Sequence, residues 1–254
     1  MGWMAGEFWL SDEQWVRLKP LLPNKPRGVP RVDDRRVISG IVHVLQPGCR
    51  WRDAPAIYGA AEDALQPQRA LGRQGRLAGC VRHVGSSRRA TGGGADRQHA
   101  REGAPLGRRR RRGAPAQAIG SSRGGRNTKV HAITDRYGRP LAFHLTPGQA
   151  ADCRAAEHLL ADLPERCIVH ADRAYDTNRI RELIEGQGAV PNIPPKRTRL
   201  WKSCFSKILY KGRNAIERMF CRLKDSRRLA NRYDRLASNF LGSTHLAAAI
   251  TWWL

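Results

Sequence analysis

The chain has 254 residues and a formal net charge of +24, with 46 lysines and arginines against 22 aspartates and glutamates. This length allows one or two domains with a buried core. The charge indicates a polyanionic partner, nucleic acid first, because basic surfaces gain affinity by releasing counterions from phosphates. The N-terminus lacks a basic start followed by an apolar core, so we expect no signal peptide. The six cysteines include no Cys-x-x-Cys pair and no histidine at zinc spacing, which favours reduced thiols in a cytoplasmic protein.

Two helices are predicted near the N-terminus. Ser11, followed by Gln14 three residues later, has the pattern of a capping box. Asp33 precedes a second helix with one apolar face, and Pro47 is expected to end it. With the arginines around these helices, residues 1–59 are predicted to form a small helical DNA-binding region.

Within this region, Arg35 and Arg36 are expected to stay solvated on the polar face of the second helix. Trp51 and Tyr58 are expected to close a small core.

The composition changes between residue 60 and residue 124. Up to about residue 113 there is no Phe, Tyr, Trp or Lys, and Arg108–Arg112 form a run of five arginines. Such a stretch has too little apolar surface to offset its ordering entropy. We therefore predict that it is mostly disordered, although it could still contact a DNA backbone.

Beyond residue 125 the pattern alternates between strands and helices. Thr128–Thr134 and Pro140–Leu145 are predicted to form a β-hairpin, and Asp152–Leu163 an amphipathic helix. A helix at Thr177–Gln187 and a strand at Ala189–Ile193 follow. The expected fold class is therefore mixed α/β.

The short apolar run before His170 ends close to an acidic residue, Asp172. A strand in this position would present the Asp172 carboxylate at its C-terminal tip, the edge where ligands bind in open α/β sheets. The alternative is an aspartate that caps the next helix. That alternative suits Asp176 better than Asp172.

The segment Tyr210–Lys224 places Tyr210, Arg213, Glu217 and Lys224 at intervals of three, four and seven residues. On a helix these intervals return to nearly the same azimuth, so one face would carry a carboxylate, two cations and a phenol. The alternative is a surface helix with an ordinary Arg213–Glu217 pair, which contributes roughly 0.3 kcal/mol.

A basic loop is predicted at Pro194–Ser206. Arg197, Lys202 and a single aromatic residue, Trp201, suit it to contacts with a DNA backbone or to base stacking. The apolar tail Leu236–Leu254 contains several polar residues, so a buried helix is favoured over a membrane span.

The pattern Tyr-x2-Arg-x3-Glu-x6-Lys, here Tyr210, Arg213, Glu217 and Lys224, resembles the signature of the DDE transposases of bacterial insertion sequences. Ala171–Asp176 is similar to the motif around the second catalytic aspartate of that family. Residues 8–59 also resemble its N-terminal part.

The resemblance implies an RNase H-like catalytic domain at residues 125–254. Asp172 and Glu217 would be the second and third catalytic residues and ligands of Mg²⁺ or Mn²⁺. Arg213 and Lys224 would hold DNA phosphates, and Tyr210 would orient the DNA. The implied partners are terminal inverted repeats, target DNA and a second copy in a homodimer, with no membrane and a nucleoid-associated location in the cytoplasm.

The resemblance fails between residues 60 and about 113, where the family has a strand carrying its first catalytic aspartate. Codons can be chosen for this stretch that spell three family words one nucleotide later, including Gln-Ile-Asp-Ser-Thr-His-Val-Lys-Ala-His across residues 95–105. We therefore predict an out-of-frame segment, and an RNase H-like sheet that lacks its normal first strand. The first aspartate would straddle the codons of Arg97 and Gln98. If the segment is instead authentic, the first ligand must be sought elsewhere, beginning with Asp96 and Asp135.

Three functions remain open from the sequence. The first is a transposase that is catalytically impaired by loss of one metal ligand and binds DNA with little or no strand cleavage. The second is a noncatalytic DNA-binding remnant or regulator that competes for element ends. The third is an unrelated basic RNA-binding protein whose motif matches are coincidental.

Overall fold

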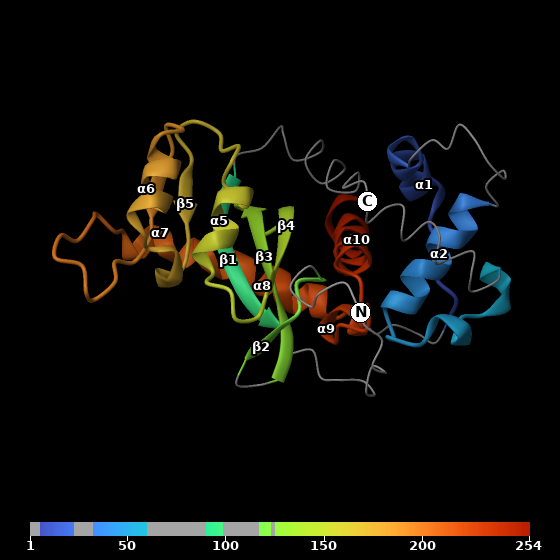
Figure 1. The fold of residues 1–254 in the computed structure, drawn as a ribbon. Helices are drawn as coiled ribbons and strands as arrows, with labels where there is room; N and C mark the ends of the chain where they lie inside the picture. The colour runs from blue at the N-terminus through green and yellow to red at the C-terminus, as the bar shows by residue number, and fades with distance from the viewer. Residues whose placement is uncertain (1–5, 23–32, 60–89, 99–116, 123–124) are drawn as a thin grey trace, which may run out of the picture. The chain divides into compact units, whose positions relative to one another are not determined.

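The structure is a computed structural model that describes residues 6–22, 33–59, 90–98, 117–122 and 125–254 (Figure 1). Its contacts divide the chain into two compact units. The first unit combines residues 1–80 with residues 223–254, and the second runs from residue 81 to residue 222. The C-terminal helices thus group with the N-terminal ones. The domain ranges expected from the sequence, 1–59, 60–124 and 125–254, stay a prediction.

The N-terminal helices form where the sequence predicts them. Ser11 and Gln14 make a complete capping box at the start of α1. The Asp33 side chain accepts hydrogen bonds from two backbone N–H groups at the start of α2, and the apolar face of α2 is buried. The helical elements of this region are α1 (Asp12–Leu18), η1 (Lys19–Leu21), α2 (Asp34–Leu45), η2 (Trp51–Asp53) and η3 (Ala56–Tyr58).

Two details of this region differ from the expectation. Arg35 and Arg36 are both half-buried rather than solvated. The Arg35 guanidinium donates to the Leu10 carbonyl at 2.6 Å and pairs with Asp12. The rings that pack against buried Tyr58 belong to Trp9 and His43, with centroids 5.4 Å and 5.2 Å from that of Tyr58.

The C-terminal segment is largely buried and helical, as predicted. Both α9 and α10 contact α2. Arg228 donates to the Cys49 carbonyl at 2.8 Å and lies over the Trp51 ring. Among the described residues, no helix is long and apolar enough to cross a membrane. The elements of this segment are α9 (Arg227–Ala230), α10 (Ala237–Ala248) and the π-helical η7 (Ala249–Trp253).

The second unit is built on the predicted hairpin of β3 (Gly125–Asp135) and β4 (Pro140–Pro147). The two strands are antiparallel, with Val130 opposite Leu145. The short strand β2 (Gly120–Ser122) pairs with the beginning of β3. At the hairpin turn Gly138 has a φ of +79°, and a Cβ there would lie 2.9 Å from the Ala215 carbonyl, so glycine is required twice over.

A strand also forms within the segment predicted to be disordered. β1 (Ala90–Gln98) pairs antiparallel with β3, with Asp96 opposite Val130, and lies beside β5 (Figure 1). The prediction of a missing first strand is therefore wrong for residues 90–98. The physical reason is that β3 leaves a row of N–H and C=O groups to be paired, and backbone pairing makes little demand on side chains. The rest of the segment between 60 and 116 lies outside the described residues.

The remaining elements of the second unit follow the predicted alternation. β5 (Ile168–His170) and β6 (Val190–Asn192) pair in parallel, joined through α6 (Asn178–Glu185). α5 (Cys153–Leu159) contacts both β3 and β4. It ends earlier than predicted, since the backbone leaves the helical region at Leu160. An apolar core, including Val169, Ile180, Ile184 and Ile193, lies between these elements.

The segment carrying the four-residue signature is not one continuous helix. It begins with α7 (Lys207–Tyr210), passes through the 3₁₀ turn η6 (Lys211–Arg213) and continues as α8 (Asn214–Lys224). Gly212 lies within this turn, in keeping with the low helix propensity of glycine. The apolar side of α8 is buried, as predicted.

Candidate active site

The site is organised around the Asp172 carboxylate at the C-terminal tip of β5. The strand is buried up to Ala171, and the chain then emerges, so that the Asp172 side chain is 36% exposed. The Tyr210 hydroxyl donates a hydrogen bond to Asp172 Oδ1 at 3.2 Å, and Arg213 Nη1 lies 3.0 Å from the same oxygen. The fold thus joins Asp172 to residues about forty positions later in the chain.

Glu217 is linked to this cluster through the same arginine. Arg213 Nη2 pairs with Glu217 Oε1, while Nη1 pairs with Asp172. The Glu217 side chain is 54% exposed, and that of Arg213 only 20%. One guanidinium therefore bridges the two carboxylates predicted as catalytic.

Tyr210 acts in this cluster as a hydrogen-bond donor. Burial, followed by the nearby Asp172 carboxylate, raises the pKa of Tyr210 to about 12, so the phenol keeps its proton at neutral pH. The Phe205 ring packs edge-on against it with centroids 5.1 Å apart.

Lys224 is the last residue of α8, seven positions beyond Glu217, and is half-buried. It belongs to the first compact unit, whereas Glu217 belongs to the second. A place for Lys224 beside the other three signature residues stays a prediction.

Asp176 anchors the first half of the predicted basic loop, Pro194–Ser206. The fully buried Asp176 carboxylate accepts from the Lys196 backbone N–H at 2.6 Å and pairs with Arg199 and Arg181, each at 2.8 Å. Asp176 does not cap the following helix, contrary to the alternative weighed from the sequence: Thr177 is the N-cap of α6. Sequence reasoning missed this anchor because its partners lie up to twenty-three residues away.

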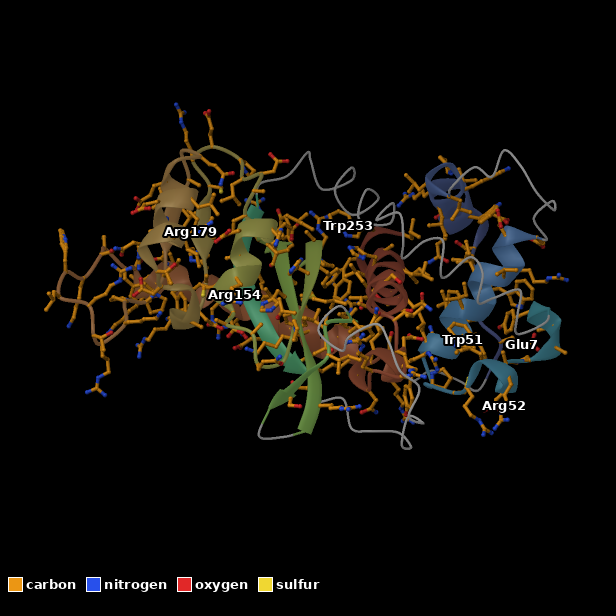
Figure 2. All side chains as sticks on the ribbon, viewed as in Figure 1. Glu7, Trp51, Arg52, Arg154, Arg179 and Trp253 are labelled. Atoms are coloured by element: carbon orange, nitrogen blue, oxygen red, sulfur yellow. The ribbon has the colours of Figure 1, made fainter. Side chains whose placement is uncertain are left out.

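The second half of the loop is held by Asn192. Its side chain accepts from the Ser206 backbone N–H at 2.8 Å and donates to the Ser206 carbonyl at 3.1 Å. The same amide lies 3.0 Å from His170 Nδ1. Between the two anchors, Arg197, Trp201 and Lys202 are exposed, and Figure 2 shows side chains extending outward from this loop.

Asp135 and Asp96 are the alternative positions for a first metal ligand. Asp135 is 1% exposed, accepts from the Tyr137 and Arg139 backbone N–H groups and pairs with the Arg139 side chain. It stabilises the hairpin turn and is not available to a metal. Asp96 lies near the C-terminal end of β1, opposite Val130 of β3, and only its backbone position is described.

Two histidines of this unit, His131 and His170, serve the fold. His131 is fully buried between the Tyr175 hydroxyl at 3.0 Å and the Thr146 hydroxyl at 2.7 Å. His170 faces Asn192 and is buried. Both therefore have a structural role.

The donor set suits a hard divalent cation. Asp172 and Glu217 offer partly exposed carboxylate oxygens, the ligand type that Mg²⁺ and Mn²⁺ prefer. Among the residues whose side chains are described, no group of three or more acidic, histidine or cysteine side chains comes together. The pair fits such an ion, with further ligands to come from substrate or water.

Two protein families match the chain. Residues 96–252 match the family described as "Transposase DDE domain", and residues 10–79 match the family described as "Putative transposase of IS4/5 family". The first match covers more than half of the chain and includes Asp172, Tyr210, Arg213, Glu217 and Lys224.

Individual relatives also carry names of transposases of insertion sequences. A Brucella ovis protein named "Putative transposase for insertion sequence element IS6501" is 39% identical over 126 residues, which span 49% of this chain and 97% of that protein. A Burkholderia cepacia protein named "Putative transposase for insertion sequence element IS402" is 31% identical over 43% of this chain and 55% of its own length. A Neisseria meningitidis protein named "Transposase for insertion sequence element IS1106" is 35% identical over 22% of this chain and 20% of its own length. No solved structure gave a significant match. The chain belongs to the DDE transposase family of bacterial insertion sequences.

Proposed function

We propose that this protein binds the ends of an insertion sequence through the Asp172 cluster, and that the same cluster is the metal-dependent centre for DNA strand cleavage and transfer. One observation carries the proposal: Asp172 and Glu217, from separate elements, meet at a single Arg213 guanidinium. Two carboxylates and a cation in a partly exposed site are what phosphodiester chemistry requires.

The chemistry is an in-line attack on a phosphodiester by water or a 3′-hydroxyl. Divalent ions, when bound, would activate the nucleophile and stabilise the leaving oxygen, and Asp172 and Glu217 are the residues that would hold them. Tyr210, a phenol that keeps its proton, can donate to a phosphate oxygen as it now donates to Asp172. Arg213 supplies the positive charge that fixes a phosphate next to the carboxylates.

The strand order supports an RNase H-like catalytic domain. β1 pairs with β3 on one side and lies beside β5 on the other, so the order across the unit is β4, β3, β1, β5, β6 (Figure 1). Asp172 follows β5 and therefore lies at a strand neighbouring β1. A carboxylate on β1 would thus be well placed to complete the metal site.

DNA is the partner that the charge favours. Arg197 and Lys202 are exposed on a loop anchored at both halves, and Trp201 between them is 68% exposed. We propose that this loop contacts DNA phosphates, with the Trp201 ring available for stacking. Lys224 and the N-terminal helical region are proposed as further DNA contacts. Inverted repeats and target DNA would be the substrates, a homodimer the assembly, and the nucleoid the location.

We further propose that catalysis is impaired, because the segment that should carry the first aspartate does not spell the family motif. A noncatalytic DNA-binding regulator is the second candidate function, and this same observation favours it. Membership of the transposase family removes the third possibility, an unrelated RNA-binding protein.

A nicking assay on a supercoiled plasmid carrying the element ends tests both candidates. With Mg²⁺ or Mn²⁺ we expect binding to the ends without cleavage. Cleavage that disappears in Asp172→Ala and Glu217→Ala would contradict the impairment and assign the full transposase activity. Glu182→Ala, which removes an exposed carboxylate on α6, is the matched control. Absence of any preference for the ends would contradict the proposed substrate.

A further inference from the structure

Arg213 occupies the position between the two carboxylates where a divalent cation would be expected. Its Nη1 lies 3.0 Å from Asp172 Oδ1 and its Nη2 pairs with Glu217 Oε1. Building on the proposed metal site, we propose that Arg213 is the resident cation of the metal-free protein, and that it must leave at least one carboxylate before a metal ion can bind.

Electrostatics requires some cation in this place. Two carboxylates close enough to share one guanidinium repel each other when both are charged, and a planar guanidinium neutralises them with two directed hydrogen bonds. A divalent ion bound by the same oxygens would stand within a few ångströms of the guanidinium. Their repulsion and the loss of the existing ion pairs both oppose metal binding while Arg213 stays.

The surroundings of Arg213 permit such a movement. Its side chain is held by the two carboxylates and lies over the Tyr210 ring, with the guanidinium carbon 5.6 Å from the ring centroid. Asp172 keeps a second partner, the Tyr210 hydroxyl, so departure of Arg213 does not leave it unpaired. The displaced guanidinium would be free to bind a phosphate of DNA. Metal binding and DNA binding would then favour each other, and by linkage to the same degree.

The test measures metal affinity and melting temperature of the full-length protein, without reference to cleavage. Mn²⁺ binding is followed by the electron paramagnetic resonance signal of the free ion. Arg213→Gln is expected to bind Mn²⁺ about tenfold more tightly than the wild type, because the competing cation is gone. Without metal it is expected to melt below the wild type, and saturating Mn²⁺ should close this gap.

Arg218→Gln is the matched control, since it removes an equal charge from an exposed position next to Glu217 on α8. It should leave Mn²⁺ affinity nearly unchanged. Arg213→Lys keeps the charge but cannot bridge two carboxylates in a fork, so its affinity should lie between those of the wild type and Arg213→Gln. Arg213→Lys also provides a second test of the inference if Arg213→Gln fails to fold.

The outcomes separate this inference from the proposed function. If Asp172→Asn and Glu217→Gln abolish Mn²⁺ binding while Arg213→Gln leaves it equal or weaker, the metal site stands and the displacement is refuted. If Arg218→Gln tightens binding as much as Arg213→Gln, only the general charge matters and the inference is again refuted. If neither the wild type nor Arg213→Gln binds Mn²⁺, the metal-dependent part of the proposed function fails together with it.

Discussion

The buried carboxylate of Asp176 lies 2.8 Å from Nε of Arg199, twenty-three residues later in the chain. Asp176 is only four residues beyond Asp172, so the element that delivers the candidate catalytic carboxylate also holds the basic loop. Burial opposes the charged form of Asp176, but the Lys196 N–H and the Arg181 and Arg199 guanidiniums outweigh it and lower its pKa. Site and loop are thus fixed by neighbouring residues of one segment.

Asp176→Asn should destabilise the protein by about 3 to 5 kcal/mol, since removing one partner leaves two guanidiniums facing a neutral side chain in a buried place. Denaturant unfolding measures the loss. Limited proteolysis between residues 194 and 206 should accelerate at the same time, because the loop loses its first anchor. Asp162→Asn, an exposed carboxylate, serves as the control and should change neither quantity. An unfolding free energy equal to that of the wild type would show that the anchor contributes no stability.

Stability should depend on pH through His131. Burial lowers the pKa of His131 to about 4, while an unfolded histidine titrates near 6.5. The unfolded state therefore binds a proton first as the pH falls, so the stability present above about pH 6.5 is progressively lost down to about pH 4. The loss amounts to on the order of 3 kcal/mol. Asp152 partly offsets this shift, and His144 and Lys129 add to it.

The comparison of His131→Gln with the wild type isolates this effect. The variant keeps a polar side chain toward Tyr175 and Thr146 but cannot titrate. Its unfolding free energy, measured in denaturant at pH 7.5 and pH 4.5, should fall less over this range than that of the wild type. Equal slopes would mean that His131 does not titrate differently on folding.

Local signals in the sequence predict a large part of this fold. Ser11 and Asp33 mark their helix starts because caps act over three or four residues, and the β3–β4 hairpin follows from alternation around a glycine turn. In the site, the spacing of Tyr210, Arg213 and Glu217 predicts residues that do meet, although they lie on α7, on the 3₁₀ turn η6 and on α8 instead of on one helix.

What the sequence could not predict depends on partners far along the chain. Asp176 resembles a helix cap until Arg199 and Lys196 are brought beside it. β1 forms from a glycine-rich stretch because β3 offers an edge to pair with, which no local pattern reveals. Tyr58 likewise meets Trp9, which lies before α1, nearly fifty residues earlier in the chain.

The loop cations should contribute to DNA affinity through phosphates. Arg197→Gln and Lys202→Gln are each expected to weaken binding about equally on all sequences and to reduce the slope of log affinity against log salt by about 1. Fluorescence anisotropy with a labelled duplex at several salt concentrations measures this slope. Arg179→Gln, which removes an exposed cation on α6 that is paired with Glu157, is the control and should leave the slope unchanged (Figure 2). Unchanged slopes in both loop variants would exclude the loop from the DNA interface.

The Trp201 ring should add affinity for unpaired bases. Trp201→Ala is expected to weaken single-stranded DNA binding by about 1 to 3 kcal/mol if a base stacks on it. Leu200→Ala removes a neighbouring exposed apolar side chain that cannot stack, and should cost much less. Similar losses in both variants would indicate general apolar contact instead of stacking.

The nucleotide sequence across codons 58 to 126 decides why the first aspartate is missing. If the frame one nucleotide later spells Ile-Asp-Ser-Thr across residues 95–99, the aspartate falls on the part of the chain that forms β1, between β3 and β5. A protein with this frame restored should then cleave element ends in Mg²⁺, and replacing the restored aspartate by asparagine should abolish cleavage. If the frame does not spell these residues, Asp96 becomes the position to test, because β1 carries it and Asp135 is already committed to its turn. Asp96→Asn would then have to reduce Mn²⁺ affinity, since a third ligand contributes to binding as well as to cleavage.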